Sequence, residues 1–283
     1  DVTDNGTYTV YVCDKAGNIT STTVEVTNID RVKPEITYTV STTEPTPTLS
    51  IEVVGTDNME LGAVTCSDSR VVKGKTNWVS KTECRQIFLI NQNGTYRFDI
   101  RDFVGNTNYV EVTIDNIDNV APTIDKIIKN PNVPTNAPLE ITIIASDVGF
   151  GLADEPYRVD GSAWQSSNKF MIADNGVHEI DVRDKAGNTI MMTTDISNLD
   201  YDNPVIDEVT QDITEQTNTD VVLTVTAHDV GLGLAKKPYK LEDSSWVSSN
   251  KFTVEENGDY VISVRDEAGN IETYTHTVSN IDK

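Results

Sequence analysis

Hydrophobic and polar positions alternate with a period of two along most of this chain. Between residues 8 and 12, Tyr8, Val10 and Val12 share one parity, and polar or mixed residues take the other. Residues 139–147, LEITIIASD, and residues 221–229, VVLTVTAHD, have the length and composition of further strands. No stretch has the 3.6-residue period of an amphipathic helix. The pattern therefore predicts an all-β fold.

Three sequence markers recur at the same intervals. Asn-Gly pairs begin at residues 5, 93, 175 and 257, and Gly-Asn pairs begin at 17, 105, 187 and 269. The sequences TNID, DNID, SNLD and SNID end at residues 30, 118, 200 and 282. Successive copies of each marker are 88, 82 and 82 residues apart, which identifies tandem repeats. We expect the C-terminal hairpin of a truncated repeat at 1–30 and complete repeats at 31–118, 119–200 and 201–283.

About seven short strand-like segments fill each complete repeat. In the last one they read PVIDEV, VVLTVTA, PYKLED, a short SSW segment, KFTVE, DYVISVRD and ETYTHTV. That many strands in 82 residues is typical of an immunoglobulin-like sandwich. The predicted fold is a series of tandem immunoglobulin-like β-sandwiches in an elongated rod.

One short phrase lies between the last two predicted strands of every repeat. It reads CDKAGN at 13–18, RDFVGN at 101–106, RDKAGN at 183–188 and RDEAGN at 265–270. Its Asp is suited to accept hydrogen bonds from the following amides, and its Gly to adopt a positive φ. We interpret the phrase as a loop-building device, and the Asn-Gly pair upstream as a similar device where the chain crosses between sheets. With a single carboxylate, the phrase by itself is a weak calcium loop.

Two tryptophans occupy equivalent places in the last two repeats. Trp164 and Trp246 each lie 11 residues before the Asn of an Asn-Gly pair. With Tyr157 and Tyr239 they are expected to fill the sandwich cores, because this fold commonly buries a Trp near the third strand. An aromatic platform for a sugar is the alternative.

Residues 175–188, NGVHEIDVRDKAGN, carry a resemblance to a known family. With PYRVDGSAW before them and NLDYDNP after them, they resemble the tandem Ig-like repeats of large secreted and cell-wall-anchored bacterial proteins. The repeat at 31–118 departs from this pattern, because it lacks the PY…W segment and carries CSDSRVVKGKTNWVSKTEC at 66–84. The resemblance implies a surface location and a stalk or adhesin role. Related repeats serve as accessory modules of secreted glycoside hydrolases, and some bind host proteins, including antibodies.

Charge narrows the classes of partner. The chain has 22 Lys and Arg against 45 Asp and Glu, a net charge of −23. Such a surface repels phosphate backbones and anionic lipid, so we expect no nucleic-acid partner. No apolar run reaches the length of a transmembrane helix, so we expect no membrane insertion in this segment. Because residue 1 already lies inside a strand pattern, we expect the chain to be a fragment of a longer extracellular protein.

The cysteines are Cys13, Cys66 and Cys84. Cys66 and Cys84 flank the insertion in one repeat, where a disulfide is plausible for a secreted chain and two buried thiols are the alternative. Cys13 aligns with an arginine of the other repeats, so we expect an exposed free thiol.

Acidic residues gather at the predicted junctions between repeats. In an Ig-like sandwich, the loop after the second strand and the loop before the last strand lie at the end that receives the preceding linker. Oxygen ligands brought together in this way suit calcium, although each Asp alone would also cap its own turn. The predicted ligands are Asp118, Asn119, Asp147 and Asp184 at one junction and Asp200, Asp202, Asn203, Asp229 and Asp266 at the next. At the first junction, Arg31 and Lys33 favour a salt bridge to Asp57 or Asp102 instead.

The insertion is the predicted binding surface. Lys73, Lys75 and Trp78 form a basic, aromatic patch on an otherwise acidic chain. Catalytic signatures for hydrolases, zinc enzymes or nucleotide-binding proteins are missing from the sequence, so we expect no enzyme activity. The expected function is a non-catalytic bacterial stalk or adhesin, extracellular, at the cell surface or secreted, that binds a host surface or secreted glycoprotein. A module that binds host proteins such as immunoglobulin, or an accessory part of a glycoside hydrolase, remains open, and calcium is the one cofactor considered.

Overall fold

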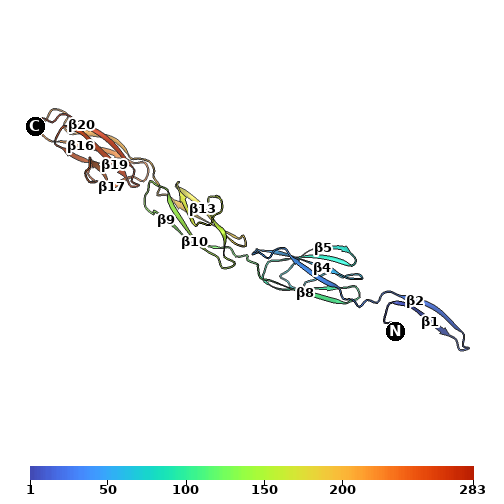
Figure 1. Cartoon of the computed structure of the whole chain (residues 1–283). Helices are drawn as coiled ribbons and strands as arrows, with labels where there is room; N and C mark the ends of the chain where they lie inside the picture. Colours follow the sequence, from blue (N-terminus) through green and yellow to red (C-terminus); the bar gives the residue numbers. More distant parts are fainter. The chain divides into compact units, whose positions relative to one another are not determined.

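The computed structural model describes all of residues 1–283 and contains β-strands and no helix (Figure 1). No helix is therefore present that would be long and apolar enough to span a membrane. The chain forms two compact units. The first comprises residues 1–120 with 185–188, and the second comprises residues 121–184 with 189–283.

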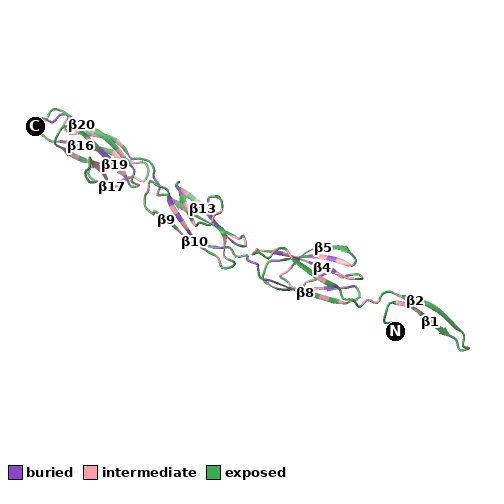
Figure 2. Cartoon of the chain, in the orientation of Figure 1, coloured by how far each residue is buried: buried purple, intermediate pink, exposed green.

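The first unit begins with a two-stranded antiparallel hairpin. Its strands are β1 (Gly6–Cys13) and β2 (Ile19–Val26), paired in register from Gly6 opposite Val26 to Cys13 opposite Ile19. Figure 2 shows this hairpin almost entirely in the colour of exposed residues. The division of the chain at residue 30 stays a prediction.

A complete sandwich follows in the same unit. Its strands are β3 (Glu35–Val40), β4 (Leu49–Thr56), β5 (Val72–Ser80), β6 (Glu83–Ile90), β7 (Gly94–Arg101) and β8 (Thr107–Ile114). One sheet has the order β3-β4-β6-β5, and β7 pairs with β8 in the other. Period-two alternation builds the core: Leu49, Ile51 and Val53 of β4 are buried while the residues between them are partly exposed. They pack with inward residues of both sheets into one cluster that includes Phe88 and Phe98.

The insertion at 66–84 is more regular than the sequence suggests. It supplies β5, which pairs with β6 and forms the edge of the four-stranded sheet. The predicted disulfide is not formed, because Cys66 and Cys84 are both free thiols; the alternative of two buried thiols holds for Cys84, whereas Cys66 is only partly buried. Cys84 faces inward on β6 and is fully buried in the core, where it packs as a small apolar side chain. Burial raises the pKa of the Cys66 thiol, and Cys13 is the exposed free thiol that the alignment predicts.

The second unit holds two further sets of six strands. The first set is β9 (Thr123–Asn130), β10 (Leu139–Ser146), β11 (Leu152–Val159), β12 (Lys169–Ile172), β13 (Gly176–Asp184) and β14 (Thr189–Ile196). The second set is β15 (Val205–Gln211), β16 (Val221–His228), β17 (Leu234–Leu241), β18 (Lys251–Val254), β19 (Gly258–Asp266) and β20 (Ile271–Val278).

Both sets have the same connectivity. The sheets have the orders β12-β10-β9 with β11-β13-β14, and β15-β16-β18 with β17-β19-β20. Strands one, two and four thus form one sheet, and strands three, five and six form the other, as in immunoglobulin domains. Each set encloses its own hydrophobic cluster, which spans residues 124–199 in one and 206–281 in the other. The chain therefore folds as tandem Ig-like β-sandwiches.

Two details of the predicted sandwich are wrong. The SSW segment forms a single bridge, Tyr239 to Val247, in place of a seventh strand. The tryptophans lie outside the cores, although Tyr157 and Tyr239 pack there. Trp164 stacks against Arg158 and Arg183, whose guanidinium carbons lie 4.6 and 4.4 Å from its ring centroid. Trp164 lies in a loop after the third strand, where its ring contacts these two arginines on the outer face of the sheet. The prediction had assumed that Trp164 points inward from a strand.

A tyrosine corner marks the fifth strand of the sandwich. The hydroxyls of Tyr8, Tyr96 and Tyr260 donate to backbone carbonyls four residues upstream, at 2.6, 2.5 and 2.7 Å. Such a corner is a hallmark of immunoglobulin folds. In the sandwich between, His178 takes this place and its Nε2 lies 3.0 Å from the carbonyl oxygen of Asp174.

Candidate metal centres

The turn phrase forms the loop that its sequence predicts. Oδ1 of Asp102 accepts the amides of Gly105 and Asn106 at 2.5 and 2.8 Å, and Asp266 accepts the corresponding amides of Gly269 and Asn270. Burial raises the pKa of Asp102, but the hydrogen bonds from Asn106 and Gly105 outweigh it and hold the pKa below its ordinary value. The carboxylate is therefore negatively charged at neutral pH.

The last Asn of the phrase has a second role that the sequence reasoning missed. Asn270 Nδ2 donates to Asp266 Oδ2 at 2.6 Å and to the carbonyl of Asp200, in the linker from the preceding sandwich, at 2.9 Å. Asn106 Nδ2 similarly faces the carbonyl of Asp30 at 3.4 Å. At these two junctions, a side chain of the final loop thus ties the incoming linker to the sandwich that follows it.

The Asn of the Asn-Gly pairs holds the opposite end of the sandwich. Asn93 donates to the carbonyl of Ile117 at 2.9 Å and accepts its amide at 2.8 Å. Asn257 exchanges the same two bonds with Ile281 at 2.7 and 2.8 Å. The isoleucine belongs to the NID marker in both cases, so the repeated residues fix the chain where it leaves the sandwich.

In the second unit, three carboxylates converge on the linker between the two sandwiches. The ligand-type oxygens of Asp200, Asp229 and Asp266 lie within 4.8 Å of one another. Asp200 is 5% exposed and its Oδ2 accepts the amide of Leu232 at 2.7 Å. The approach is close enough that a Cβ on Gly231 would lie 2.1 Å from Asp200 Oδ2, so any other residue there would displace the Asp200 carboxylate. These three residues were predicted as ligands.

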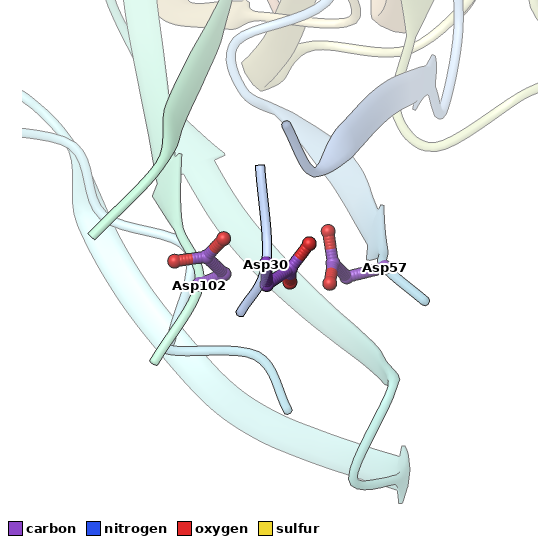
Figure 3. Close-up of side chains that lie close together, drawn as sticks. All are labelled: Asp30, Asp57 and Asp102. Atoms are coloured by element: carbon purple, nitrogen blue, oxygen red, sulfur yellow. The ribbon is translucent and has the colours of Figure 1, made fainter. Parts of the chain in front are cut away.

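A matching cluster lies in the first unit, at the junction where a salt bridge was predicted. Oxygens of Asp30, Asp57 and Asp102 also lie within 4.8 Å of one another. Figure 3 shows the Asp30 carboxylate between those of Asp57 and Asp102. The predicted salt bridge is wrong: the guanidinium of Arg31 donates to the carbonyl of Thr3 instead. The signal that was missed is the final Asp of TNID, which recurs as the final Asp of SNLD.

Electrostatic repulsion works against such clusters in the absence of a cation. Two carboxylates 4 Å apart repel by about 4 kcal/mol where the effective dielectric constant is about 20. Ion pairs form elsewhere in the chain, but none involves a carboxylate of either cluster. Oxygen-only ligand sets of this kind suit a hard divalent cation such as calcium.

The remaining predicted ligands stand apart from these two clusters. Asp202 and Asn203 are exposed, and Asn203 Nδ2 lies 3.3 Å from Glu272 Oε2. Asn119 Nδ2 donates to the Asn91 carbonyl at 3.3 Å. Asp118 belongs to the first unit, whereas Asp147 and Asp184 belong to the second. A metal site at that junction stays a prediction.

The predicted binding patch lies on the edge strand. Lys73, Lys75 and Trp78 are all exposed on β5, and 48% of Trp78 is accessible. A shallow hollow of about 280 Å³ adjoins Trp78 and is lined by Glu60, Leu61, Ser80 and Lys81. A role for the patch stays a prediction.

No protein-family model and no curated protein matches this chain. One similar solved structure is the C-terminal 282-residue fragment of intimin in complex with the intimin-binding domain of the translocated intimin receptor. It is 14% identical to this chain with a TM-score of 0.35, and the match covers 65% of this chain and 69% of that chain. The Escherichia coli adhesin FdeC is 13% identical with a TM-score of 0.31, over 86% and 96%. The mouse nectin-like molecule 4 ectodomain is 11% identical with a TM-score of 0.29, over 84% and 96%. At such low TM-scores and identities, the resemblance says nothing of function or partners.

Proposed function

We propose that the chain is a non-catalytic, extracellular segment of a bacterial surface protein, in which linked sandwiches act as a load-bearing stalk and present a binding surface. One observation carries the proposal: the polar residues that recur in every repeat bind backbone where the chain enters or leaves a sandwich. Asn270 holds the incoming linker, and Asn257 holds the outgoing strand end. The recurring Asn residues thus lie at the points through which tension along the chain would pass.

Single-molecule stretching tests the mechanical part of this proposal. Each complete sandwich is expected to unfold in a separate step that releases roughly 280 Å of chain, because a repeat of 82 residues extends by about 3.4 Å per residue. Asn270→Ala and Asn257→Ala should lower the force of one step each. Extension without separate steps would contradict a load-bearing role.

Calcium at the junction inside the second unit belongs to the same proposal. Asp200 comes from the linker, Asp229 from the loop after β16, and Asp266 from the last position of β19. An ion shared by these three carboxylates would remove their mutual repulsion and stiffen the joint. Gly231→Ala is expected to weaken calcium binding, because the added Cβ displaces the Asp200 carboxylate.

The edge strand β5 supports a second candidate function, which is binding of a host glycoprotein or an immunoglobulin. An edge strand has unpaired backbone groups that a partner strand can use, and Trp78 and Lys73 supply exposed side chains beside them. Serum glycoproteins and antibodies should be retained by the immobilised chain and lost with Trp78→Ala. The matched control is Trp246→Ala, because Trp246 stacks on Arg265 in another sandwich. Equal retention by both variants would dispose of this surface.

A further inference from the structure

Two carboxylate oxygens in the first unit are buried without a hydrogen-bond partner. Asp30 Oδ2 and Asp57 Oδ2 each expose less than 1 Å² and accept no donor. The other oxygen of each group is occupied, since Asp30 Oδ1 accepts the amide of Val32 and Asp57 Oδ1 accepts that of Met59. A buried acceptor left unpaired is destabilising, and two unpaired carboxylate oxygens in one cluster point to a cation-binding site.

No side chain of the protein supplies that positive charge. Arg31, the nearest basic residue in sequence, bonds to Thr3, and Lys33 makes no ion pair. The one side-chain donor that reaches Asp30 is the neutral amide of Asn58, at 3.4 Å from Oδ1. No basic side chain therefore neutralises the cluster, whose third member, Asp102, is 3% exposed.

The spacing of the oxygens fits an ion of a particular size. Calcium–oxygen bonds are about 2.3–2.6 Å long, so two ligands on opposite sides of the ion lie roughly 5 Å apart. The ligand oxygens of Asp30, Asp57 and Asp102 lie within 4.8 Å of one another, which lets all three contact one such ion. Magnesium requires distances of about 2.0–2.1 Å and a stricter octahedral arrangement. Three carboxylates with no His or Cys therefore favour calcium.

The second unit contains the same arrangement from a different stretch of sequence. Asp229 Oδ1 is again completely buried and unpaired beside Asp200 and Asp266. In both places a linker Asp joins one Asp just after the second strand and one Asp at or just after the end of the fifth strand. A buried, unpaired carboxylate oxygen therefore recurs in both units, even though the two linkers differ in the residues next to their Asp.

We propose that Asp30, Asp57 and Asp102 bind one calcium ion, which fastens the linker after the hairpin to the first complete sandwich. Asp30 lies in the linker between β2 and β3, Asp57 lies just after β4, and Asp102 lies just after β7 (Figure 3). Water fills the remaining ligand positions. Direct contact between linker and loop is weaker here than in the second unit, at 3.4 Å from Asn106 to the Asp30 carbonyl against 2.9 Å from Asn270 to Asp200. The first junction therefore depends more on the ion than the second does.

Calcium binding to the full 283-residue chain tests this site independently of the proposed stalk role. After dialysis against a chelator, the chain is titrated with calcium chloride in about 0.15 M salt, which screens diffuse binding to acidic surfaces. Compared with the unaltered chain, Asp57→Asn is expected to lose one equivalent of bound calcium or to bind it at least tenfold more weakly. Asp14→Asn is the matched control, since Asp14 is the Asp of the same turn phrase in the hairpin but belongs to no cluster. Unchanged binding by Asp57→Asn, or an equal loss in Asp14→Asn, overturns the proposal.

Thermal unfolding separates a metal ligand from a merely structural residue. In chelator, Asp57→Asn should unfold at the same or a higher temperature than the unaltered chain, because one repelling charge has gone. In calcium it should unfold at a lower temperature. Asp30→Asn should behave in the same way. Because Asp30 lies in the linker, this variant shows whether the effect of Asp57→Asn comes only from a folding defect in the loop after β4. A decrease of the same size in both solutions, for both variants, would reject the site.

Discussion

His178 occupies the position at which the other repeats carry the corner tyrosine. Its Nδ1 lies 2.7 Å from Asp160 Oδ2 while its Nε2 lies 3.0 Å from the Asp174 carbonyl. Because both partners are acceptors, both ring nitrogens must carry protons for the two bonds to coexist. Burial lowers the pKa of His178, but the bonds to Asp160 and Asp174 outweigh it and raise the pKa above its ordinary value. The charged ring therefore contributes to the stability of its sandwich.

This arrangement predicts a stability loss on the alkaline side of neutrality. The folded-state pKa is raised, so the contribution is complete below pH of about 6.5 and disappears as pH rises through the folded pKa. The expected loss is on the order of 1.5 kcal/mol, typical of a hydrogen bond to a charged group. His178→Tyr, which copies the corner of Tyr260, should abolish this step in the free energy of unfolding between pH 6 and 9. A step of equal size in His178→Tyr would assign the effect to another group.

At the scale of the strand and loop, the sequence predicted what depends on periodicity and on turn chemistry. The strands Leu139–Ser146 and Val221–His228 were located correctly because β-alternation is local. The placement of Trp164 was wrong because stacking on Arg158 and Arg183 depends on contacts between strands far apart in the sequence. The Asp30 cluster was missed for the same reason: the direction of Arg31 cannot be read from its position in the chain.

The Asn of the NID marker gives a prediction at this scale. Asn280 is 8% exposed, and its Nδ2 donates to the carbonyls of Ile213 and Glu215 at 2.9 and 2.8 Å. Asn280→Ala leaves both carbonyls without this donor and is expected to destabilise the last sandwich by about 1–3 kcal/mol in chemical denaturation. Asn28 has the same place in the exposed hairpin, so Asn28→Ala should leave stability unchanged. A similar loss in both variants would mean that the marker acts by some other route.

At the scale of the whole molecule, the question is whether the three sandwiches unfold together or independently. Three hydrophobic clusters have no residue in common, and each is enclosed by its own pair of sheets. Repeat arrays in which neighbours touch only at their ends behave nearly as sums of local stabilities. The net charge of −23 adds repulsion throughout the chain but no cooperative core. The segment boundaries drawn from the sequence therefore predict separate unfolding units.

Core truncation tests this separation. Phe98 is fully buried and its ring centroid lies 4.7 Å from that of Phe88, so Phe98→Ala should cost about 3–5 kcal/mol. Hydrogen exchange followed by mass spectrometry should then show faster exchange in β4, β6 and β7, with β16 and β19 unaffected. Ile262→Ala, a fully buried position in the last cluster, should give the reverse pattern with a cost of about 2–5 kcal/mol. Because neither cluster contributes a side chain to the other, faster exchange in both regions with either variant would show one cooperative unit instead of several.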